Sequence, residues 1–315
     1  ERLPQSLQEE TQLRDLNMNR TETVVIGAGA IGMLCAAPLA KTEGIALRIA
    51  ASGERLNRLR EHGLYLNGQP LQAEFASEGG NRTADFILIA TKAAGYPDAL
   101  ELAAKFTGSQ TVVVPLLNGI SAEETAKRRF PENDVVCGFF LGHASVRNGN
   151  HIEHDGVGTF YLGTTVSEAP EAVRRTAELF RRAKISCAVP EDMRAALWKK
   201  FVLNIGINQA TAHFRADYGE LQRDPARLEF TMRLMREASA VAEKLGIAGA
   251  ADMPEAAMHT ILTMPGNVKT SMFQDVEAGR PTEVALFAGT LCRLGRETGI
   301  PTPLNDEILR EFSGE

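Results

Sequence analysis

Residues 23–32 read TVVIGAGAIG, and they are the strongest indication of the fold class. Its β-branched beginning, Thr23 to Ile26, predicts a buried strand, and a helix is expected to follow from about Ala30 to Lys41. Pro38 should kink or shorten that helix near its end. A glycine-rich turn between a strand and a helix is typical of proteins that bind dinucleotides.

The glycines of this turn, Gly27, Gly29 and Gly32, have the G-x-G-x-x-G spacing. The first glycine permits a tight turn, the second lets the backbone approach a pyrophosphate, and the third lets the helix pack closely on the strand. The N-terminus of the helix would face the phosphates. Glycine-rich turns are common, so the prediction of a dinucleotide site depends on the strand before the turn and on the small residues Ala36 and Ala37 after it.

Farther along the chain, apolar runs alternate with helical stretches. Strands are expected at Ala46–Ala50, Phe86–Ala90 and Thr111–Pro115, and a helix at Glu54–Glu61. This alternation predicts a parallel sheet that is covered on both faces. The segment His151–Leu162 alternates, contains two glycines and is interpreted as a hairpin.

A last strand is expected at Ile185–Val189, and only helices after it. The predicted helices span about residues 191–213, 226–245, 268–278, 283–298 and 303–312. The fold class is therefore α/β, with an N-terminal Rossmann-type dinucleotide-binding domain over residues 21–189. An all-α C-terminal domain over residues 190–315 follows it.

The composition excludes several classes of protein. The chain has 315 residues, enough for two domains, and a net charge of −6 without the basic stripe that nucleic-acid binding needs. No apolar run approaches the roughly 20 residues that span a bilayer, and Glu1 to Arg20 lack the apolar stretch of a signal peptide. Four widely spaced cysteines are typical of reduced thiols in a cytoplasmic protein. A homodimer is compatible with the sequence, although no local pattern favours one.

A metal site is not expected. His151, His154 and Asp155 are close together in the sequence, but no third ligand has supporting spacing, so these residues are interpreted as surface residues.

The end of the second expected strand favours one form of the cofactor. NAD-binding proteins usually carry an acidic residue there, which binds the ribose hydroxyls. This chain reads Ala50-Ala51-Ser52-Gly53 instead, and Ser52 and Arg55 could hold a 2′-phosphate, which favours NADP. The neighbouring Glu54 weakens this preference, and Arg55 could also be a solvated side chain in the first turn of a helix.

One helix carries a polar stripe among apolar residues. Lys200, Asn204 and Asn208 are spaced i, i+4 and i+8, so they line one helix face. Such a stripe is costly unless it meets partners or a ligand. A protonated lysine can stabilise the charge that develops on a carbonyl oxygen during hydride transfer and then donate the proton. Asparagine amides can hold a carboxylate or hydroxyl. A surface lysine with two asparagines bonded to nearby loops remains the alternative.

Six motifs in order resemble the ketopantoate reductase (2-dehydropantoate 2-reductase) family from about Glu22 to the C-terminus. Besides the glycine turn, they are the segment Ile89–Ala93 with its lysine and the Leu117–Ile120 loop with its Asn-Gly pair. The others are the helix that contains Leu-Trp-Lys-Lys-Phe followed by Asn204 and Asn208, and the two segments Thr270–Asp275 and Gly279–Glu283.

This resemblance implies a role for each matching residue. The catalytic residues would be Lys200, as the general acid, and Glu283, near the substrate and the nicotinamide ribose. The substrate, a 2-keto acid, would be held by Lys200, Asn204, Asn208 and Ser271. Besides Glu283, the residues that would touch NADPH are Gly27, Ala28, Gly29, Ala30, Ile31, Gly32, Lys92, Asn118 and Ala144.

Several of these residues have simpler explanations. Lys92 could be a surface charge at a strand end, Asn118-Gly119 is a turn signal by itself, and Ser271 could cap a helix. Glu283, just after Pro281, suits the first turn of a helix because of the helix dipole.

The implied activity is the reduction of 2-dehydropantoate to pantoate by NADPH, in the cleft between the two domains, on the way to pantothenate and coenzyme A. This chain has Tyr218 and Val268 where some family members have asparagine in the substrate pocket. A sister reductase that acts on another 2-keto acid is therefore an alternative, and a non-catalytic NADP-binding regulator is another.

Overall fold

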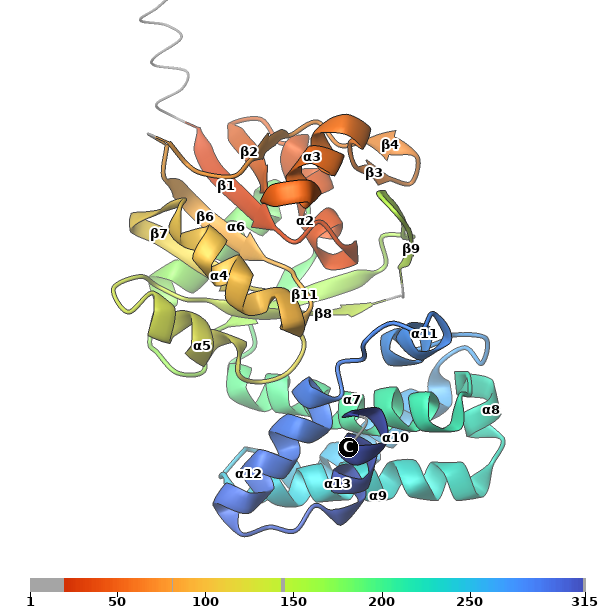
Figure 1. Ribbon diagram of the computed structural model, residues 1–315. Helices are drawn as coiled ribbons and strands as arrows, with labels where there is room; N and C mark the ends of the chain where they lie inside the picture. Colours follow the sequence, from red (N-terminus) through yellow and green to blue (C-terminus); the bar gives the residue numbers. More distant parts are fainter. Residues whose placement is uncertain (1–19, 81, 143–144, 314–315) are drawn as a thin grey trace, which may run out of the picture. The chain divides into compact units, whose positions relative to one another are not determined.

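The computed structural model describes residues 20–80, 82–142 and 145–313 (Figure 1). The chain forms two compact units. The N-terminal unit contains the residues up to Leu117 and the stretch Glu123–Val189, and the helical unit contains Asn118–Ala122 and the residues from Pro190 onward. The short segment Asn118–Ala122 thus packs with the helical unit although it lies between two stretches of the N-terminal one. At this segment the expected uninterrupted domain over residues 21–189 differs from the structure.

The N-terminal unit is built on a parallel sheet with the strand order β5-β2-β1-β6-β7. Its middle strands are continuous apolar runs because both faces are covered. This arrangement confirms the predicted Rossmann-type fold. Successive strands are added on one side of β1, as β2 and β5, and then on its other side, as β6 and β7. The strands are β1 (Thr21–Ile26), β2 (Ile45–Ala50), β5 (Glu74–Ala76), β6 (Ala84–Ile89) and β7 (Thr107–Pro115).

Helices cover both faces of this sheet. Val25 and Leu88 face a core that they share with Met33 of α2 and Phe180 of α6, and α4 packs on β6 from the other side (Figure 1). Pro38 lies in the last turn of α2, which ends two residues later. The helices are α2 (Ala30–Ala40), α3 (Gly53–His62), α4 (Tyr96–Ala104), α5 (Ala122–Arg129) and α6 (Pro170–Arg182).

Two smaller sheets complete the N-terminal unit, and they show that the predicted hairpin over His151–Leu162 is wrong. β10 pairs with β9 and β3, whereas β11 pairs with β8 and β12. The alternating pattern located the strands but could not identify their partners, because pairing depends on residues remote in the sequence. The strands are β3 (Tyr65–Leu66), β4 (Gln69–Pro70), β8 (Cys137–Gly142), β9 (Val146–Asn148), β10 (His151–Glu153), β11 (Gly158–Gly163) and β12 (Cys187–Ala188).

The helical unit is organised around α7 (Met193–Phe214). Asp192 caps this helix by accepting a hydrogen bond from the backbone N–H of Ala195. The helix is apolar on most sides, as expected for a central helix that neighbours surround. It packs against α9, α10 and α11. The other helices are α8 (Tyr218–Gln222), α9 (Pro225–Lys244), α10 (Met253–Thr263), α11 (Ser271–Glu277), α12 (Thr290–Thr298) and α13 (Pro303–Ser313).

The helical unit differs from the prediction in two respects. Helices α8 and α10 were not foreseen, and the predicted helix over residues 283–298 begins as a π-helical segment, Ala285–Gly289, before α12. The described residues after Pro190 contain no strand, as the sequence indicated. None of the described helices combines the length and apolar character that a membrane span requires.

Candidate functional site

The glycine turn lies where β1 ends beside β6. Gly27 has a φ of +94°, and a Cβ atom there would lie 2.5 Å from the carbonyl oxygen of Ala90. A Cβ atom at Gly32 would lie 1.9 Å from the carbonyl oxygen of Gly27. The first and third glycines are therefore required by the protein's own packing, as their places in the pattern predict.

The middle glycine has a different environment. Gly29 is the N-cap residue of α2, where no side chain caps the helix. A Cβ atom there would meet only the Nη1 atom of Arg147, at 3.9 Å. The protein does not need a glycine at this position for its own packing. An approaching pyrophosphate would need one, because it would lie against this backbone and the N–H groups of α2. The residues present therefore fit a dinucleotide.

Ser52 and Arg55 lie just beyond β2. Ser52 is the N-cap residue of α3, its side chain forms no capping hydrogen bond, and it is exposed. Arg55 is half-buried in the first turn of the same helix. Both side chains lie at the carboxyl end of a central strand, where the adenosine ribose binds in this kind of fold.

The remaining expected cofactor residues of the N-terminal unit are Lys92 and Ala144. Lys92 follows β6 and begins a short 3₁₀ turn, Ala93–Gly95, with its side chain exposed. Lys92 lies two residues after Ala90, whose carbonyl oxygen is next to Gly27. Ala144 lies outside the described residues, as does His143.

The helical unit brings Lys200, Asn118 and Glu283 together. The Lys200 Nζ donates a hydrogen bond to Asn118 Oδ1 at 3.1 Å, and Asn118 Nδ2 donates one to Glu283 Oε2, also at 3.1 Å. The asparagine amide thus connects the ammonium group to the carboxylate. We refer to these residues as the Lys200 triad. A Cβ atom at the next residue, Gly119, would lie 2.7 Å from Leu286 Cδ1, so this glycine lets the loop approach the π-helical segment.

The environment of Lys200 changes its acidity. Burial lowers the pKa of Lys200 to about 8, and the negative charge of Glu283 opposes this shift by raising the pKa. Desolvation disfavours the charged ammonium, whereas a nearby carboxylate favours it. The balance places the pKa of the lysine in the range where it can donate a proton near neutral pH.

A second polar group continues along the same face of α7. Asn208 Nδ2 donates to Asn204 Oδ1 at 3.0 Å, and Ser271 Oγ donates to Asn208 Oδ1 at 3.3 Å. Both asparagines are buried. Ser271 does not cap α11, because that role belongs to Thr270, whose side chain accepts from the backbone N–H of Phe273. The simpler explanation of Ser271 is therefore wrong.

An ion pair between two of the sequence motifs was not foreseen. Arg280 Nε donates to the Asp275 Oδ1 atom at 2.9 Å, and the carboxylate is buried. This pair ties α11 to the segment that carries Glu283. The sequence signal was the aspartate that ends one motif and the arginine at the second position of the next, which have opposite charges and lie five residues apart. The π-helical segment that follows Glu283 is a second such feature, and segments of this kind are frequent at functional sites.

The histidines near the β9–β10 hairpin differ from their prediction in part. His151 is exposed, as expected, but His154 is buried and its Nδ1 atom accepts from the backbone N–H of Gly156 at 2.8 Å. Its interpretation as a surface residue is wrong because a local backbone bond fixes the ring inside. Within the described part of the chain, no group of three or more His, Cys, Asp or Glu side chains could hold a metal ion.

Comparison with known proteins gives relatives along nearly the whole chain. The 2-dehydropantoate 2-reductase of Mesorhizobium japonicum is 28% identical, over 90% of this chain and 94% of its own length. The crystal structure of 2-dehydropantoate 2-reductase from Methylococcus capsulatus is 26% identical with a TM-score of 0.81, covering 93% of this chain and 96% of that one. A D-mandelate dehydrogenase structure with NADH and anilino(oxo)acetate shares the fold, with a TM-score of 0.83 and 20% identity. It covers 93% of this chain and 97% of that one.

Two family models match in sequence order. Residues 23–167 match the one described as "Ketopantoate reductase PanE/ApbA", and residues 192–314 match its C-terminal counterpart. Together these matches span most of the chain and include the glycine turn, the Lys200 triad and both asparagines. The chain therefore belongs to the ketopantoate reductase family of oxidoreductases.

Proposed function

We propose that this chain reduces 2-dehydropantoate to pantoate with NADPH and that Lys200 is the general acid. The observation that carries the proposal is the Lys200 triad, with its shifted lysine pKa, on the same helix face as Asn204 and Asn208. The named relatives, which include 2-dehydropantoate 2-reductases, support this substrate.

Each residue of the triad has a distinct task. The bound nicotinamide would supply hydride to the keto carbon. Lys200 stabilises the negative charge that develops on the keto oxygen and donates its proton there. Asn118 accepts one ammonium N–H and thereby orients Nζ, and the negative charge of Glu283 helps to keep the group protonated. The amides of Asn204 and Asn208, with Ser271, hold the carboxylate or hydroxyl of the substrate.

The direct test is NADPH oxidation with 2-dehydropantoate, compared with NADH. Turnover that requires the keto acid and prefers NADPH supports the proposal. Binding of NADPH without turnover of any carbonyl compound would identify a non-catalytic regulator instead.

A sister reductase is the second candidate, and one contact favours it. The backbone N–H of Tyr218 donates to the carbonyl oxygen of Val268 at 3.1 Å, so the two departures from the family pattern lie side by side. Together they replace polar side chains by a buried phenol and a branched apolar group. Assays with a panel of 2-keto acids that differ in the bulk of the side chain distinguish the candidates. A 2-dehydropantoate reductase has its highest kcat/KM with 2-dehydropantoate, whereas a sister reductase has it with another acid.

The pH dependence follows from the lysine pKa. Lys200 must be protonated to act as an acid, so kcat/KM is expected to be constant below pH 8 and to fall above it, by about tenfold per pH unit. Because the charge of Glu283 raises this pKa, Glu283→Gln should move the descending limb to lower pH. Initial rates at saturating NADPH and limiting keto acid measure both profiles. A profile that rises through this range would contradict the assigned role.

Replacement of Asn118 separates two roles for this residue. The family resemblance assigns Asn118 to the cofactor, whereas its hydrogen bonds join Lys200 and Glu283. Asn118→Ala removes two hydrogen bonds to charged groups and is expected to lower kcat by about 10- to 100-fold. The Kd for NADPH, measured by fluorescence titration, should change by less than about threefold. A large rise in the Kd for NADPH with an unchanged kcat would show that Asn118 binds the cofactor and does not position Lys200.

A further inference from the structure

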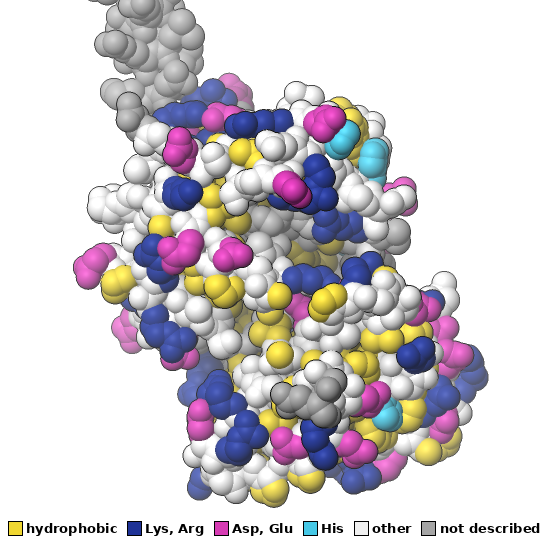
Figure 2. Space-filling view, viewed as in Figure 1, with side chains coloured by type: hydrophobic (Ala, Val, Ile, Leu, Met, Phe, Trp, Pro, Cys, Tyr) yellow, Lys and Arg dark blue, Asp and Glu magenta, His cyan; other side chains and the backbone are white. Residues whose placement is uncertain are grey.

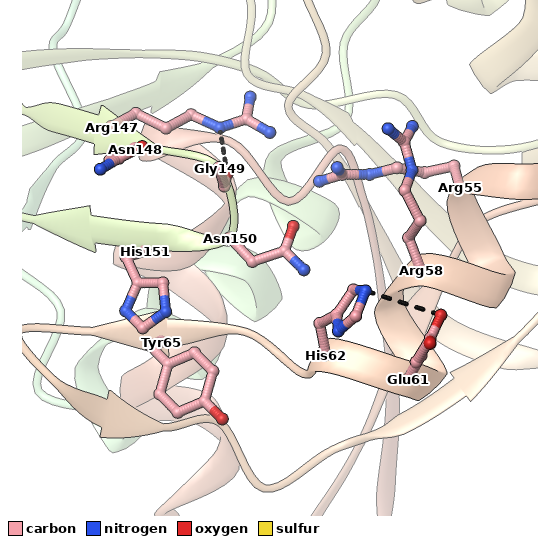
Figure 3. A pocket seen from close by; sticks show the side chains of 10 residues that line it. All are labelled: Arg55, Arg58, Glu61, His62, Tyr65, Arg147, Asn148, Gly149, Asn150 and His151. Atoms are coloured by element: carbon pink, nitrogen blue, oxygen red, sulfur yellow. Dashed lines mark hydrogen bonds and ion pairs between the residues drawn. The ribbon is translucent and has the colours of Figure 1, made fainter.

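A pocket of about 920 Å³ opens in the N-terminal unit between α3 and the β9–β10 hairpin (Figure 3). One wall comes from Arg55 and Arg58 of α3, and another from Arg147 of β9. The floor includes Tyr65 and His151, whose rings stack with centroids 4.4 Å apart. The pocket thus joins segments that are far apart in the sequence.

The pocket is strongly basic. Figure 3 shows the guanidinium groups of Arg55, Arg58 and Arg147 gathered in the upper part of the view. Its lining contains a single carboxylate, Glu61, which pairs with His62 at 3.5 Å. Among the described residues, Arg55 and Arg58 form no ion pair. Figure 2 shows basic side chains and histidines gathered over α3.

Burial and the like charges both act on Arg55. Burial lowers the pKa of Arg55, and the neighbouring charges of Arg147 and Arg58 lower it further. Mutual repulsion of this kind is unfavourable in the protein alone and is relieved when an anion binds between the charges. The Nε–H group of Arg147 donates to the carbonyl oxygen of Gly149 at 3.0 Å, which holds this side chain in place.

The position of the pocket identifies the anion. Arg55 lies just past the carboxyl end of β2, where the adenosine ribose binds in a Rossmann-type unit. Arg147 Nη1 lies 3.9 Å from the place of a Cβ atom at Gly29, so the pocket adjoins the glycine turn. A negative group on the 2′ position of that ribose would point into the basic pocket.

We propose that Arg58 and Arg147 join Arg55 in holding the 2′-phosphate of NADPH, so that Arg147 determines cofactor specificity from the β9–β10 hairpin. This inference rests on the cofactor named in the proposed function. The planar guanidinium groups can each give two parallel hydrogen bonds to phosphate oxygens, which point charges such as lysines cannot. Ser52, beside Arg55, can add a neutral donor.

The test uses two ligands that lack nicotinamide, so it does not depend on any turnover. Adenosine 2′,5′-bisphosphate carries the 2′-phosphate, and adenosine 5′-monophosphate is the matched ligand without it. Calorimetric titration of the full chain should give tighter binding of the bisphosphate. Arg147→Ala and Arg58→Ala should each weaken bisphosphate binding by about tenfold or more and change monophosphate binding by less than about twofold.

Arg60→Ala is the matched control, because Arg60 is exposed on the same helix, does not line the pocket and donates to the carbonyl oxygen of Phe75. It should leave both affinities unchanged. Arg147→Lys keeps the charge without the planar fork and should recover part of the lost affinity. Since Arg147 is exposed, its variants should keep the melting temperature of the parent.

Three results would overturn the inference. The first is an equal loss of affinity for both ligands in Arg147→Ala, which would assign Arg147 to the other phosphates. The second is unchanged bisphosphate affinity in that variant. The third is equal affinity of the parent protein for the two ligands. Failure of keto-acid reduction would contradict the proposed function and leave this result intact.

Discussion

Lys200→Ala is expected to lower kcat for keto-acid reduction by about three orders of magnitude. In the proposed mechanism, this variant lacks both the charge that would stabilise the developing oxyanion and the proton that would complete the reaction. The side chain hydrogen bonds to Asn118 at 3.1 Å within the Lys200 triad, and its lowered pKa suits proton donation near neutral pH. Single-turnover oxidation of bound NADPH after mixing with 2-dehydropantoate measures the chemical step directly.

The neighbouring lysine is the natural control for this experiment. Lys199 is exposed and lies next to Lys200 on α7, so Lys199→Ala should keep kcat within about twofold of the parent. NADPH binding should survive in both variants, since the glycine turn belongs to the other unit. If Lys200→Ala retained turnover within about tenfold of the parent, another group would have to supply the proton.

Gly32→Ala is expected to reduce the free energy of unfolding by about 3 kcal/mol. The added Cβ atom would lie 1.9 Å from the carbonyl oxygen of Gly27, and neither backbone segment can move without separating α2 from β1. Urea denaturation monitored by circular dichroism gives the loss. Because the damage is to the fold itself, dinucleotide affinity should fall with it.

Gly29→Ala is the matched variant, and it is expected to change NADPH affinity while leaving the free energy of unfolding nearly unchanged. The nearest atom to its Cβ would be Arg147 Nη1 at 3.9 Å, an ordinary contact, and Gly29 has an extended backbone that alanine adopts without strain. The unfolding free energy should stay within about 0.5 kcal/mol of the parent. The Kd for NADPH should rise by about tenfold or more, because the methyl group occupies the approach to the pyrophosphate. Unchanged NADPH affinity in this variant would remove the glycine turn from the cofactor site.

The sequence predicted those parts of the fold that depend on local patterns. The parallel sheet followed from β-branched apolar runs separated by helical stretches, and the glycine turn from its spacing. The β9–β10 hairpin did not follow, because alternation in His151–Leu162 reports which residues face a core but not which strand lies alongside. The short α8, of five residues, is too brief for the helical period to emerge from its sequence.

The candidate site divides in the same way. Helical spacing predicted that Lys200, Asn204 and Asn208 share one face, and the Asn204–Asn208 hydrogen bond joins two of them. The contacts of Lys200 with Asn118 and of Asn118 with Glu283 join residues that are 82 and 165 positions apart. No local pattern encodes such distances, and only the resemblance to a family placed these residues in one list. The roles of all of them remain predictions for the experiments above.

The membership of Asn118–Ala122 in the helical unit limits how this architecture can be recombined. A chimaera that fused residues 190–315 to a foreign nucleotide-binding module would inherit an ammonium group without the amide that anchors it. It would also lose the glycine against which Leu286 packs. An exchange of modules that keeps the Lys200 triad has to carry this loop as a separate insert, so the smallest transferable unit with these three residues is discontinuous along the chain.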